Sequence, residues 1–282
     1  MIAMQQTLGL IAGEGEFPLL VLRGAKAAGL RVAVVGLREC YLPAVRDEAD
    51  LFHEAGIARL GRWIRLLRRA GATQAVMAGR VAKTRIVALP WWRQLLVYWP
   101  DWTSLRVYYF GAADRRNDSL LGAVADEMMR KGVTLIDSTA YCRDALAGEG
   151  LLTRGTLTEA QTADVELGWR MAKEMGRLDI GQSVAVFCKD IIAVEAIEGT
   201  DAMIARAGQL CKAGGWTLVK TAKPNQDMRF DVPTIGATTV QRVADARGKV
   251  IVVEADKTLI LERDKTIDLA NKLGIVIVGH RE

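Results

Sequence analysis

The chain has 282 residues, of which half are apolar and a quarter are charged. This balance is typical of a globular protein with two ordinary domains or one large one, and it excludes a disordered chain, a collagen and a small disulfide scaffold. The net charge is +5, with +6 in the first 147 residues and −1 in the rest. Such a basic half is typical of proteins that contact phosphates, nucleic acid or an anionic membrane, and also of ordinary basic surfaces.

The N-terminal half alternates strands and helices. The apolar run Leu8–Ala12 predicts a strand, and Phe17–Ala28 predicts a helix that Gly29 ends. Strand–helix alternation predicts a mostly parallel sheet with helices on both faces, and hence an α/β fold for a first domain over residues 1–147. Further strands are expected at 32–36, 74–78 and 133–136, and further helices at 58–70 and 117–131.

A Gly- and Thr-rich stretch over residues 148–160 has weak periodicity, and we interpret it as a linker. A second α/β domain is expected over residues 161–282. Helices are expected at 160–175, 201–212 and 267–273, and strands at 184–187, 191–196, 217–219, 250–253, 258–261 and 275–278.

Cysteine and histidine do not indicate a site. The four cysteines lie far apart and form no CxxC motif, which favours free thiols in a reducing compartment, and the two histidines are too few for a His-rich metal site. We find no apolar run of membrane-spanning length and no signal-peptide pattern, so we expect a cytoplasmic protein.

The turn after the first strand reads Gly13-Glu14-Gly15-Glu16-Phe17-Pro18. Glycines there would let backbone N–H groups approach a phosphate at a helix N-terminus. Pro18 replaces the third glycine of a dinucleotide fingerprint, and the two glutamates would repel a pyrophosphate. The pattern leaves a plain tight turn, a nucleotide or sugar contact and, less in keeping with it, an NAD site.

Two other segments are unusual in composition. Arginines recur through residues 59–69 beside an apolar stripe, which suits an anionic surface or a helix packed on a sheet. Eight of the 17 aromatic residues fall within 86–110. That mixture of rings and arginines suits a bilayer interface, a subunit contact or an aromatic core beneath a loop.

The densest polar pattern lies in the second half. Glu195, Glu198 and Asp201 follow an apolar strand, where carboxylates are well placed to hold a divalent cation or to cap a helix. The segment Lys220–Pro233 adds two lysines, an arginine and two aspartates, braced by two prolines. Fixed cations beside carboxylates are what phosphoryl chemistry requires, although a solvated charged loop would have the same composition.

Six segments together resemble the LpxI-type UDP-2,3-diacylglucosamine pyrophosphatases of lipid A biosynthesis. They are LGLIAGEGEFP near the start, MAGRV at 77–81, RRNDSLL at 115–121, LDIGQSVAV at 178–186, AVEAIEGTDAMI at 193–204 and KTAKPNQDMRFDVPTIG at 220–236. The resemblance covers nearly the whole chain. It implies a Rossmann-like N-terminal domain and a C-terminal α/β domain of unusual topology.

The resemblance also implies an activity. It is the Mg²⁺- or Mn²⁺-dependent hydrolysis of UDP-2,3-diacylglucosamine to lipid X and UMP, by water attack on the phosphorus nearer the sugar. It further implies a homodimer, peripheral on the inner face of the inner membrane, that binds no nucleic acid. The residues implied are Asp231, Asp201 and Lys223 in catalysis, Asp231, Glu195 and Glu198 at the metal, and Gly13, Gly15, Gly79, Asp118, Gly199, Thr200, Lys220, Gln226, Arg229 and Thr234 at the substrate.

Two rival functions remain at this stage. A carrier or sensor of a glycolipid or nucleotide sugar would use the same cations, but it would gain little from five nearby acids. A dinucleotide-dependent oxidoreductase has only Gly13 and Gly15 in its favour.

Overall fold

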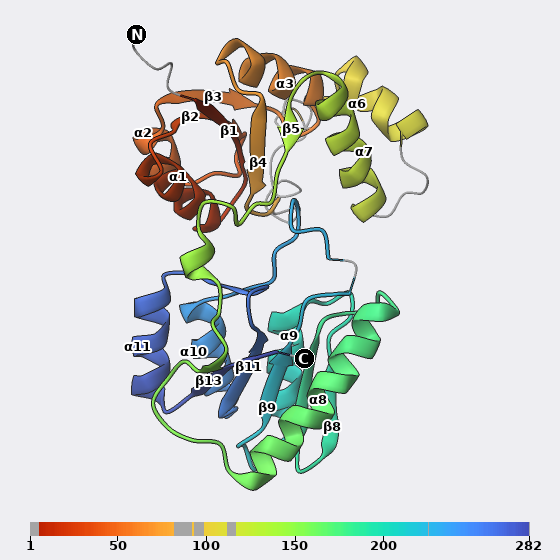
Figure 1. Cartoon of the computed structure of the whole chain (residues 1–282). Coiled ribbons are helices and arrows are strands. Elements are labelled where there is room, and N and C mark those ends of the chain that lie inside the picture. Colours follow the sequence, from red (N-terminus) through yellow and green to blue (C-terminus); the bar gives the residue numbers. More distant parts are fainter. Residues whose placement is uncertain (1–5, 82–91, 93–98, 112–116, 225, 282) are drawn as a thin grey trace. The chain divides into compact units, whose positions relative to one another are not determined.

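The computed structural model describes residues 6–81, 92, 99–111, 117–224 and 226–281, without the side chains of 117 and 118. The chain forms two compact units (Figure 1). Unit 1 comprises Met1–Cys142 and Asp227–Phe230, and unit 2 comprises Arg143–Gln226 and Asp231–Glu282. The predicted linker, residues 148–160, belongs to unit 2.

Unit 1 is built on a five-stranded parallel sheet in the order β3-β2-β1-β4-β5. This is the strand order of dinucleotide-binding folds, so the Rossmann-like prediction is confirmed. The sheet contains β1 (Thr7–Ala12), β2 (Arg31–Leu37), β3 (Leu51–Ala55), β4 (Gln74–Ala78) and β5 (Thr134–Leu135).

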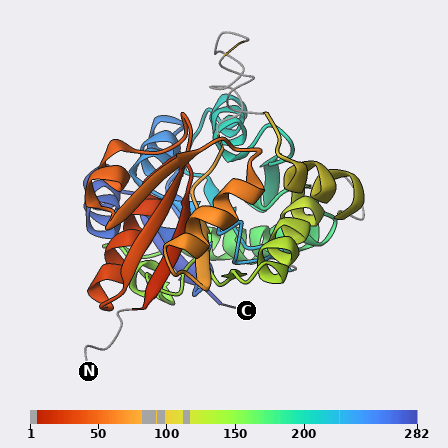
Figure 2. The same cartoon turned by 90° about the horizontal axis from the view of Figure 1, so that it is seen from above.

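Helices cover both faces of this sheet (Figure 2). The connecting helices are α1 (Phe17–Ala27), α2 (Pro43–Glu48) and α3 (Leu60–Arg69), and α7 (Asn117–Arg130) leads into β5. Helix α3 buries Trp63, Ile64 and Leu67 in a core shared with Met128 of α7. Its arginines therefore face outward, as amphipathic spacing requires.

The described part of the aromatic segment forms two short helical elements in unit 1, α6 (Trp102–Arg106) and a π-helical turn, η1 (Val107–Gly111). Val107 is buried, whereas Trp102 and Phe110 are exposed. An aromatic core beneath a loop is therefore wrong for Trp102 and Phe110. Residues 86–91 and 93–98 lie outside the described residues.

Unit 2 is built on a six-stranded mixed sheet in the order β6-β13-β11-β9-β7-β8. Strands β9, β11 and β13 are mutually parallel, whereas β7 runs antiparallel to both β9 and β8. The strands are β6 (Gly150–Leu151), β7 (Ser183–Phe187), β8 (Asp190–Val194), β9 (Thr217–Lys220), β11 (Val250–Glu254) and β13 (Val276–His280). A second, two-stranded sheet pairs β10 (Thr234–Ile235) with β12 (Leu259–Ile260).

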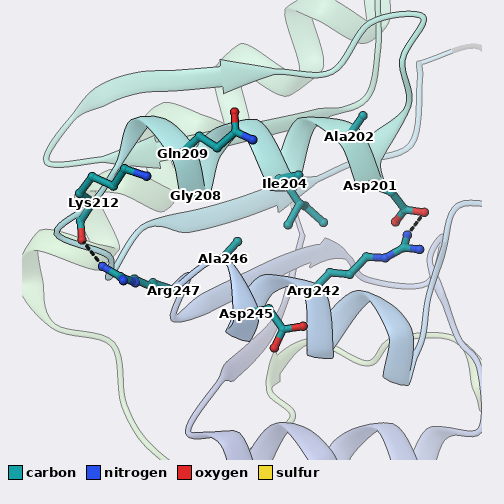
Figure 3. Close-up of a pocket in the computed structure, with 11 residues that line it drawn as sticks. Asp201, Ala202, Ile204, Gly208, Gln209, Lys212, Arg242, Asp245, Ala246 and Arg247 are labelled. Atoms are coloured by element: carbon teal, nitrogen blue, oxygen red, sulfur yellow. Dashed lines mark hydrogen bonds and ion pairs between the residues drawn. The ribbon is translucent and has the colours of Figure 1, made fainter.

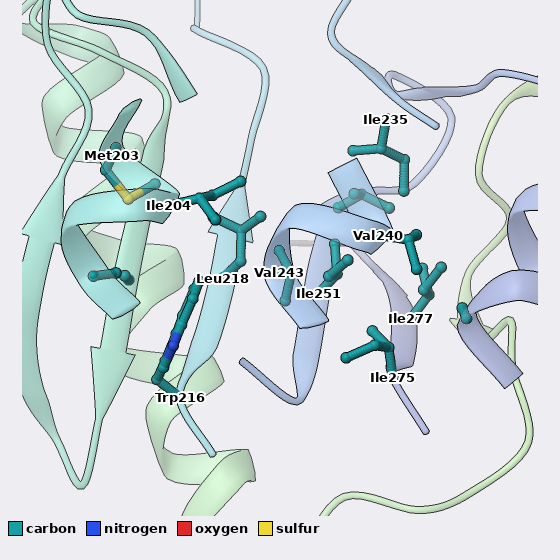
Figure 4. Packing of buried hydrophobic residues seen from close by; sticks show 14 of the residues in the cluster. Met203, Ile204, Trp216, Leu218, Ile235, Val240, Val243, Ile251, Ile275 and Ile277 are labelled. Carbon is teal, nitrogen blue, oxygen red and sulfur yellow. The ribbon is translucent and has the colours of Figure 1, made fainter. Parts of the chain in front are cut away.

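Alternating side chains give this sheet two separate cores. Val184, Val219 and Val252 pack with Trp169 of α8 (Glu159–Arg177) on one face. Leu218 and Ile251 point to the other face, into the core drawn in Figure 4. That second core is covered by α9 (Thr200–Leu210), α10 (Ala237–Asp245) and α11 (Arg263–Leu273). Both faces are therefore buried, which agrees with the α/β prediction.

Candidate active site

Polar side chains of unit 2 gather at one edge of the mixed sheet. Lys220 ends β9, and the antiparallel pairing places Ser183, the first residue of β7, directly beside it. Strand β8 ends one residue before Glu195, whose N–H donates to Ser183 O at 2.9 Å. Ligands of open α/β sheets bind outside the carboxyl ends of parallel strands, so this edge is the candidate site of unit 2.

Lys220 is a buried cation, only 8% exposed. Its Nζ lies 3.3 Å from the Thr200 hydroxyl, which in turn donates to Glu195 Oε1 at 2.8 Å. Burial lowers the pKa of Lys220, and the carboxylates of Glu195 and Asp231 partly offset that effect. The three predicted residues Lys220, Thr200 and Glu195 thus form one connected polar cluster.

Three buried oxygen atoms near this cluster have no hydrogen-bond partner among the described residues. Glu195 Oε2 is one, and the side-chain oxygens of Gln182 and Thr221 are the others. Gln182 and Thr221 flank the paired strand ends, and the Thr221 N–H donates to Gln182 O at 3.0 Å. Buried polar atoms normally have partners, so these oxygens are candidates for contacts with a ligand, an ion or water.

Asp231 is exposed and is held by Gln226 of the same unit. The Gln226 amide nitrogen donates to Asp231 Oδ2 at 2.9 Å and to the Asp231 carbonyl oxygen at 2.5 Å. Gln226 Oε1 accepts the N–H of Lys223 at 3.0 Å. Gln226 therefore joins the Lys223 backbone to the carboxylate of Asp231. The Gln226 side chain thus holds this loop in addition to the two prolines that were predicted to stiffen it.

The remaining charged residues predicted in unit 2 have ion-pair partners of their own. Glu198 pairs with Arg206 at 2.6 Å, and Lys223 pairs with Asp179 at 2.6 Å. Asp201 forms an ion pair with Arg242 of α10. The structure therefore does not gather Glu198, Asp201 and Lys223 around Lys220, and their catalytic and metal roles stay predictions.

The described residues contain no group of three or more His, Cys, Asp or Glu side chains placed to hold a metal ion. Glu195, Glu198 and Asp231 are thus not brought together as one ligand set. Mg²⁺ commonly takes one or two protein carboxylates and completes its shell with water and substrate phosphates. The unpartnered oxygen of Glu195, with Asp231 acting on the same lysine, fits that smaller donor set.

In unit 1 the predicted glycines have a backbone role. The loops after β1 and β4 hydrogen-bond to each other, and the Gly13 N–H donates to Ala78 O at 2.8 Å. A Cβ on Gly13 would lie 2.8 Å from Arg80 O, and one on Gly79, which has a φ of +89°, would lie 2.7 Å from Gly13 C. Close backbone approach therefore explains both glycines without a ligand.

Five further predicted residues lie elsewhere. Gly15 has a φ of +101° in the turn before α1, and Gly199 is the N-cap of α9 beside Thr200. Thr234 begins β10 in unit 2, whereas Arg229 belongs to unit 1 and pairs with Asp227 at 2.7 Å. Asp118 lies in the first turn of α7, and its side chain is outside the described part.

Both halves of the chain match known family domains. Residues 7–145 match the LpxI N-terminal domain, and residues 148–278 match the LpxI C-terminal domain. A UDP-2,3-diacylglucosamine pyrophosphatase LpxI from Caulobacter vibrioides is 34% identical over 96% of this chain and 96% of its own length. The chain belongs to the LpxI family. The resemblance inferred from the six segments is confirmed.

Sequence reasoning missed one residue at the sheet edge of this LpxI-family chain. Glu254 ends β11, is buried, and accepts both contacts of Lys173 Nζ at 2.8 Å. It also accepts the N–H of Ala222, two residues after Lys220, at 2.8 Å. Burial raises the pKa of Glu254, but Lys173, Lys257 and Ala222 outweigh it and the net pKa is lowered. Its only sequence signal was a charged residue at the end of an apolar strand.

A groove of about 650 Å³ lies between α9 and α10 in unit 2 of this LpxI-family chain (Figure 3). Ile204, Gly208 and Ala246 line its middle, and the ion pair of Asp201 with Arg242 lies at one end. Asp201 thus lines the groove and faces an arginine. The interpretation of Asp201 as a helix cap did not predict this position beside an arginine.

Proposed function

We propose that this protein hydrolyses UDP-2,3-diacylglucosamine to 2,3-diacylglucosamine 1-phosphate (lipid X) and UMP in lipid A biosynthesis. Membership of the LpxI family over both domains supports this, and the Caulobacter relative carries the name of that activity. The structural observation that carries the proposal is the buried ammonium group of Lys220, which contacts Thr200 and whose pKa the carboxylates of Glu195 and Asp231 raise against the effect of burial. A diphosphate needs a fixed cation, and its hydrolysis needs a group that orients water.

The residues of the cluster divide the chemistry between them. Lys220 stabilises negative charge on the diphosphate, and the backbone N–H groups of the first turn of α9, which begins at Thr200, add hydrogen-bond donors. Asp231, which is exposed and oriented by Gln226, accepts the proton of the attacking water. Water oxygen bonds to the phosphorus nearer the sugar, the bond from that phosphorus to the bridging oxygen breaks, and UMP leaves with the bridging oxygen.

Glu195 and Asp231 are the residues that would hold Mg²⁺ or Mn²⁺ in this proposal. Support comes from the unpartnered, buried Oε2 of Glu195. When bound, the ion would neutralise phosphate charge, which Lys220 alone offsets only in part. Thr200 fixes the other oxygen of Glu195 by its hydrogen bond, so the free oxygen keeps one orientation.

We place the enzyme in the cytoplasm as a homodimer, peripheral on the inner face of the inner membrane. A diacylated substrate resides in a leaflet, so a protein that acts on it must reach that surface. In the described part of the chain, no helix combines the length and the apolar character needed to cross a membrane. The oligomeric state is checked by light scattering on the purified protein.

The deciding experiment incubates purified protein with UDP-2,3-diacylglucosamine and Mg²⁺, with and without EDTA, and detects UMP by mass spectrometry. UMP and lipid X that disappear with EDTA would support both the reaction and the metal. In ¹⁸O water, the label should appear in lipid X and not in UMP. Folded protein that binds the lipid but forms no UMP would instead identify a carrier.

Two variants assign the proton acceptor. Asp231→Ala should abolish UMP release, because no other group would replace the oriented carboxylate. Asp245→Ala, at another exposed aspartate, in α10 of the same unit, should leave turnover unchanged. Retained turnover in Asp231→Ala would remove Asp231 from the mechanism.

A further inference from the structure

Large aromatic side chains are exposed together on unit 1. Trp102 is 87% exposed and Phe110 is 86% exposed, on the consecutive elements α6 and η1. Trp99 and Tyr109, at 61% and 64%, extend the same segment. Monomeric soluble proteins rarely expose so many large aromatic side chains close together, so this surface is a candidate binding surface.

Helix α3 presents a row of arginines beside these rings. Its apolar residues are buried, and Arg62, Arg65, Arg68 and Arg69 are exposed. Within the described ranges, no ion pair joins any of these four to a carboxylate. By contrast, the neighbouring Arg106 and Arg130 both form ion pairs with Glu127. Among the residues that the structure describes, the α3 row is therefore positive charge without ion-pair partners.

The rings and the arginines are held together by specific contacts. The N-terminus of α3 lies against α6, where Ser104 Oγ accepts the N–H of Leu60 at 3.0 Å. A groove of about 580 Å³ is lined by Arg59 of the turn before α3 and by Trp99, Trp102 and Leu105. Cationic and aromatic groups therefore share one surface, which we name the α3–α6 surface: Arg59, Arg62, Arg65, Arg68, Arg69, Trp99, Trp102, Tyr109 and Phe110.

We propose that the α3–α6 surface docks this protein on an anionic phospholipid membrane. Tryptophan, tyrosine and phenylalanine side chains insert at headgroup depth, where an apolar ring and a polar edge are both accommodated. Arginines are attracted to anionic headgroups, and each basic residue near such a surface strengthens binding roughly fivefold. The inference rests on the proposed function, since it names the surface by which the enzyme reaches the leaflet of its diacylated substrate.

Charge favours lipid over a second copy of the chain on this surface. A twofold contact would place the surface against itself and bring arginine rows together. The nearby carboxylates are already engaged, since Asp101 accepts backbone N–H groups and Glu127 contacts three cations. A bilayer with anionic headgroups supplies both the missing negative charge and the apolar phase.

The test measures co-sedimentation of the full chain with vesicles. Vesicles of phosphatidylcholine are compared with vesicles in which part of it is replaced by phosphatidylglycerol, at low and high salt. Wild type should bind the anionic vesicles more than about tenfold better, and salt should weaken that binding. The proposal would be overturned if the same fraction of the protein stayed in the supernatant with both types of vesicle.

Two double variants separate the contributions. Trp102→Ser with Phe110→Ser should lose at least about tenfold in binding to anionic vesicles. Arg62→Gln with Arg65→Gln should lose roughly 25-fold, with a weaker salt dependence. The matched controls are Ile197→Ser with Leu210→Ser, which are exposed apolar residues of unit 2, and Arg154→Gln with Arg170→Gln. Equal losses in the controls, or dissociation of a wild-type dimer by the aromatic variant, would overturn the assignment.

The proposal can fail separately from the proposed function. Both double variants should release UMP at the wild-type rate when the substrate is presented in detergent micelles, and should be slower only on substrate embedded in vesicles. Wild type that binds vesicles but releases no UMP in micelles would refute the activity and leave the docking surface standing. Slower turnover of the variants in micelles would count against a docking role.

Discussion

Asp101 and Arg62, which are 39 residues apart in the sequence, join α3 to α6: the backbone N–H of Arg62 donates to Asp101 Oδ2 at 3.1 Å. The other carboxylate oxygen caps α6 by accepting the N–H of Ser104 at 2.9 Å. The Asp101 side chain therefore accepts backbone N–H groups in the first turns of both α3 and α6. This carboxylate, together with the hydrogen bond from the Leu60 N–H to Ser104 Oγ, fixes α3 against α6.

Asp101→Ala should lower the free energy of unfolding by about 1–2 kcal/mol, since it removes both caps. It should also weaken binding to anionic vesicles although it removes a negative charge, because α3 and α6 lose their fixed placement. Chemical denaturation and vesicle co-sedimentation measure the two effects. Asp101→Asn keeps a hydrogen-bond acceptor, so its stability and its vesicle binding should lie between those of wild type and Asp101→Ala. Vesicle binding by Asp101→Ala that is stronger than that of wild type would contradict this explanation.

Gly168 of α8 is expected to tolerate no side chain. A Cβ there would lie 2.6 Å from Cγ2 of Val219 and 2.9 Å from Cγ2 of Val186. Gly168→Ala should therefore destabilise the protein by about 1–3 kcal/mol through overpacking. Gly122→Ala in α7 is the matched control, because a Cβ there has open space, and it should stabilise by about 0.5–1 kcal/mol. Thermal unfolding that ranked the two variants the other way would show that α8 can move off the sheet.

Glu127 should make stability depend on acid pH. Contacts with Arg130, Lys131 and Arg106 lower its pKa from 4.5 to about 2, so its contribution is complete above pH 4.5 and is lost as pH falls toward 2. We expect Glu127→Gln to lose on the order of 2 kcal/mol at neutral pH, because the half-exposed arginines are screened by water. Denaturation at several pH values should show the wild-type advantage shrinking across that window. An advantage that does not depend on pH would assign the effect to packing.

Lys220→Met should reduce UMP release by about 100-fold or more, because the apolar chain fills the space but supplies no charge to the diphosphate. Lys212→Met, an exposed lysine of the same unit, is the control and should be unaffected. A small effect of Lys220→Met would move phosphate recognition away from this sheet edge.

The pH profile tests Lys220 in another way. Since burial lowers its pKa, activity should fall on the alkaline side below the ordinary lysine value of 10.5. Glu195 raises that pKa, so its removal in Glu195→Gln should move the alkaline limb of the residual activity to still lower pH. A shift to higher pH would mean that Glu195 does not face the ammonium group.

Much of unit 1 could be predicted because its central strands are continuous apolar runs separated by amphipathic helices. The missed elements include β3, an edge strand that contains His53 and Glu54, and α2, which has only six residues. An edge strand with polar residues has no apolar run, and so short a helix has too few turns to show a period.

The candidate site was predictable only in part, for a reason of geometry. Lys220 ends β9 and Glu195 follows β8, and these two strands run in the same direction on either side of β7, so both residues lie at one edge of the sheet. Glu198 and Asp201 lie near Glu195 in sequence, but a turn and the first residues of α9 direct them to different arginines. Glu254 lies at this edge of the sheet only because of tertiary packing, and no local sequence motif predicts that position.

The assignment of residues 227–230 to unit 1 affects how the protein is made. Phe230 packs against the core of unit 1, and the N–H of Ser138 donates to Met228 O at 3.0 Å. These residues leave the ribosome only after most of unit 2 has been synthesised. Unit 1 therefore cannot complete its core while its own first 142 residues are emerging. Cutting the gene after Cys142 would produce a first fragment that lacks residues 227–230 of unit 1 and a second fragment that carries them inside unit 2.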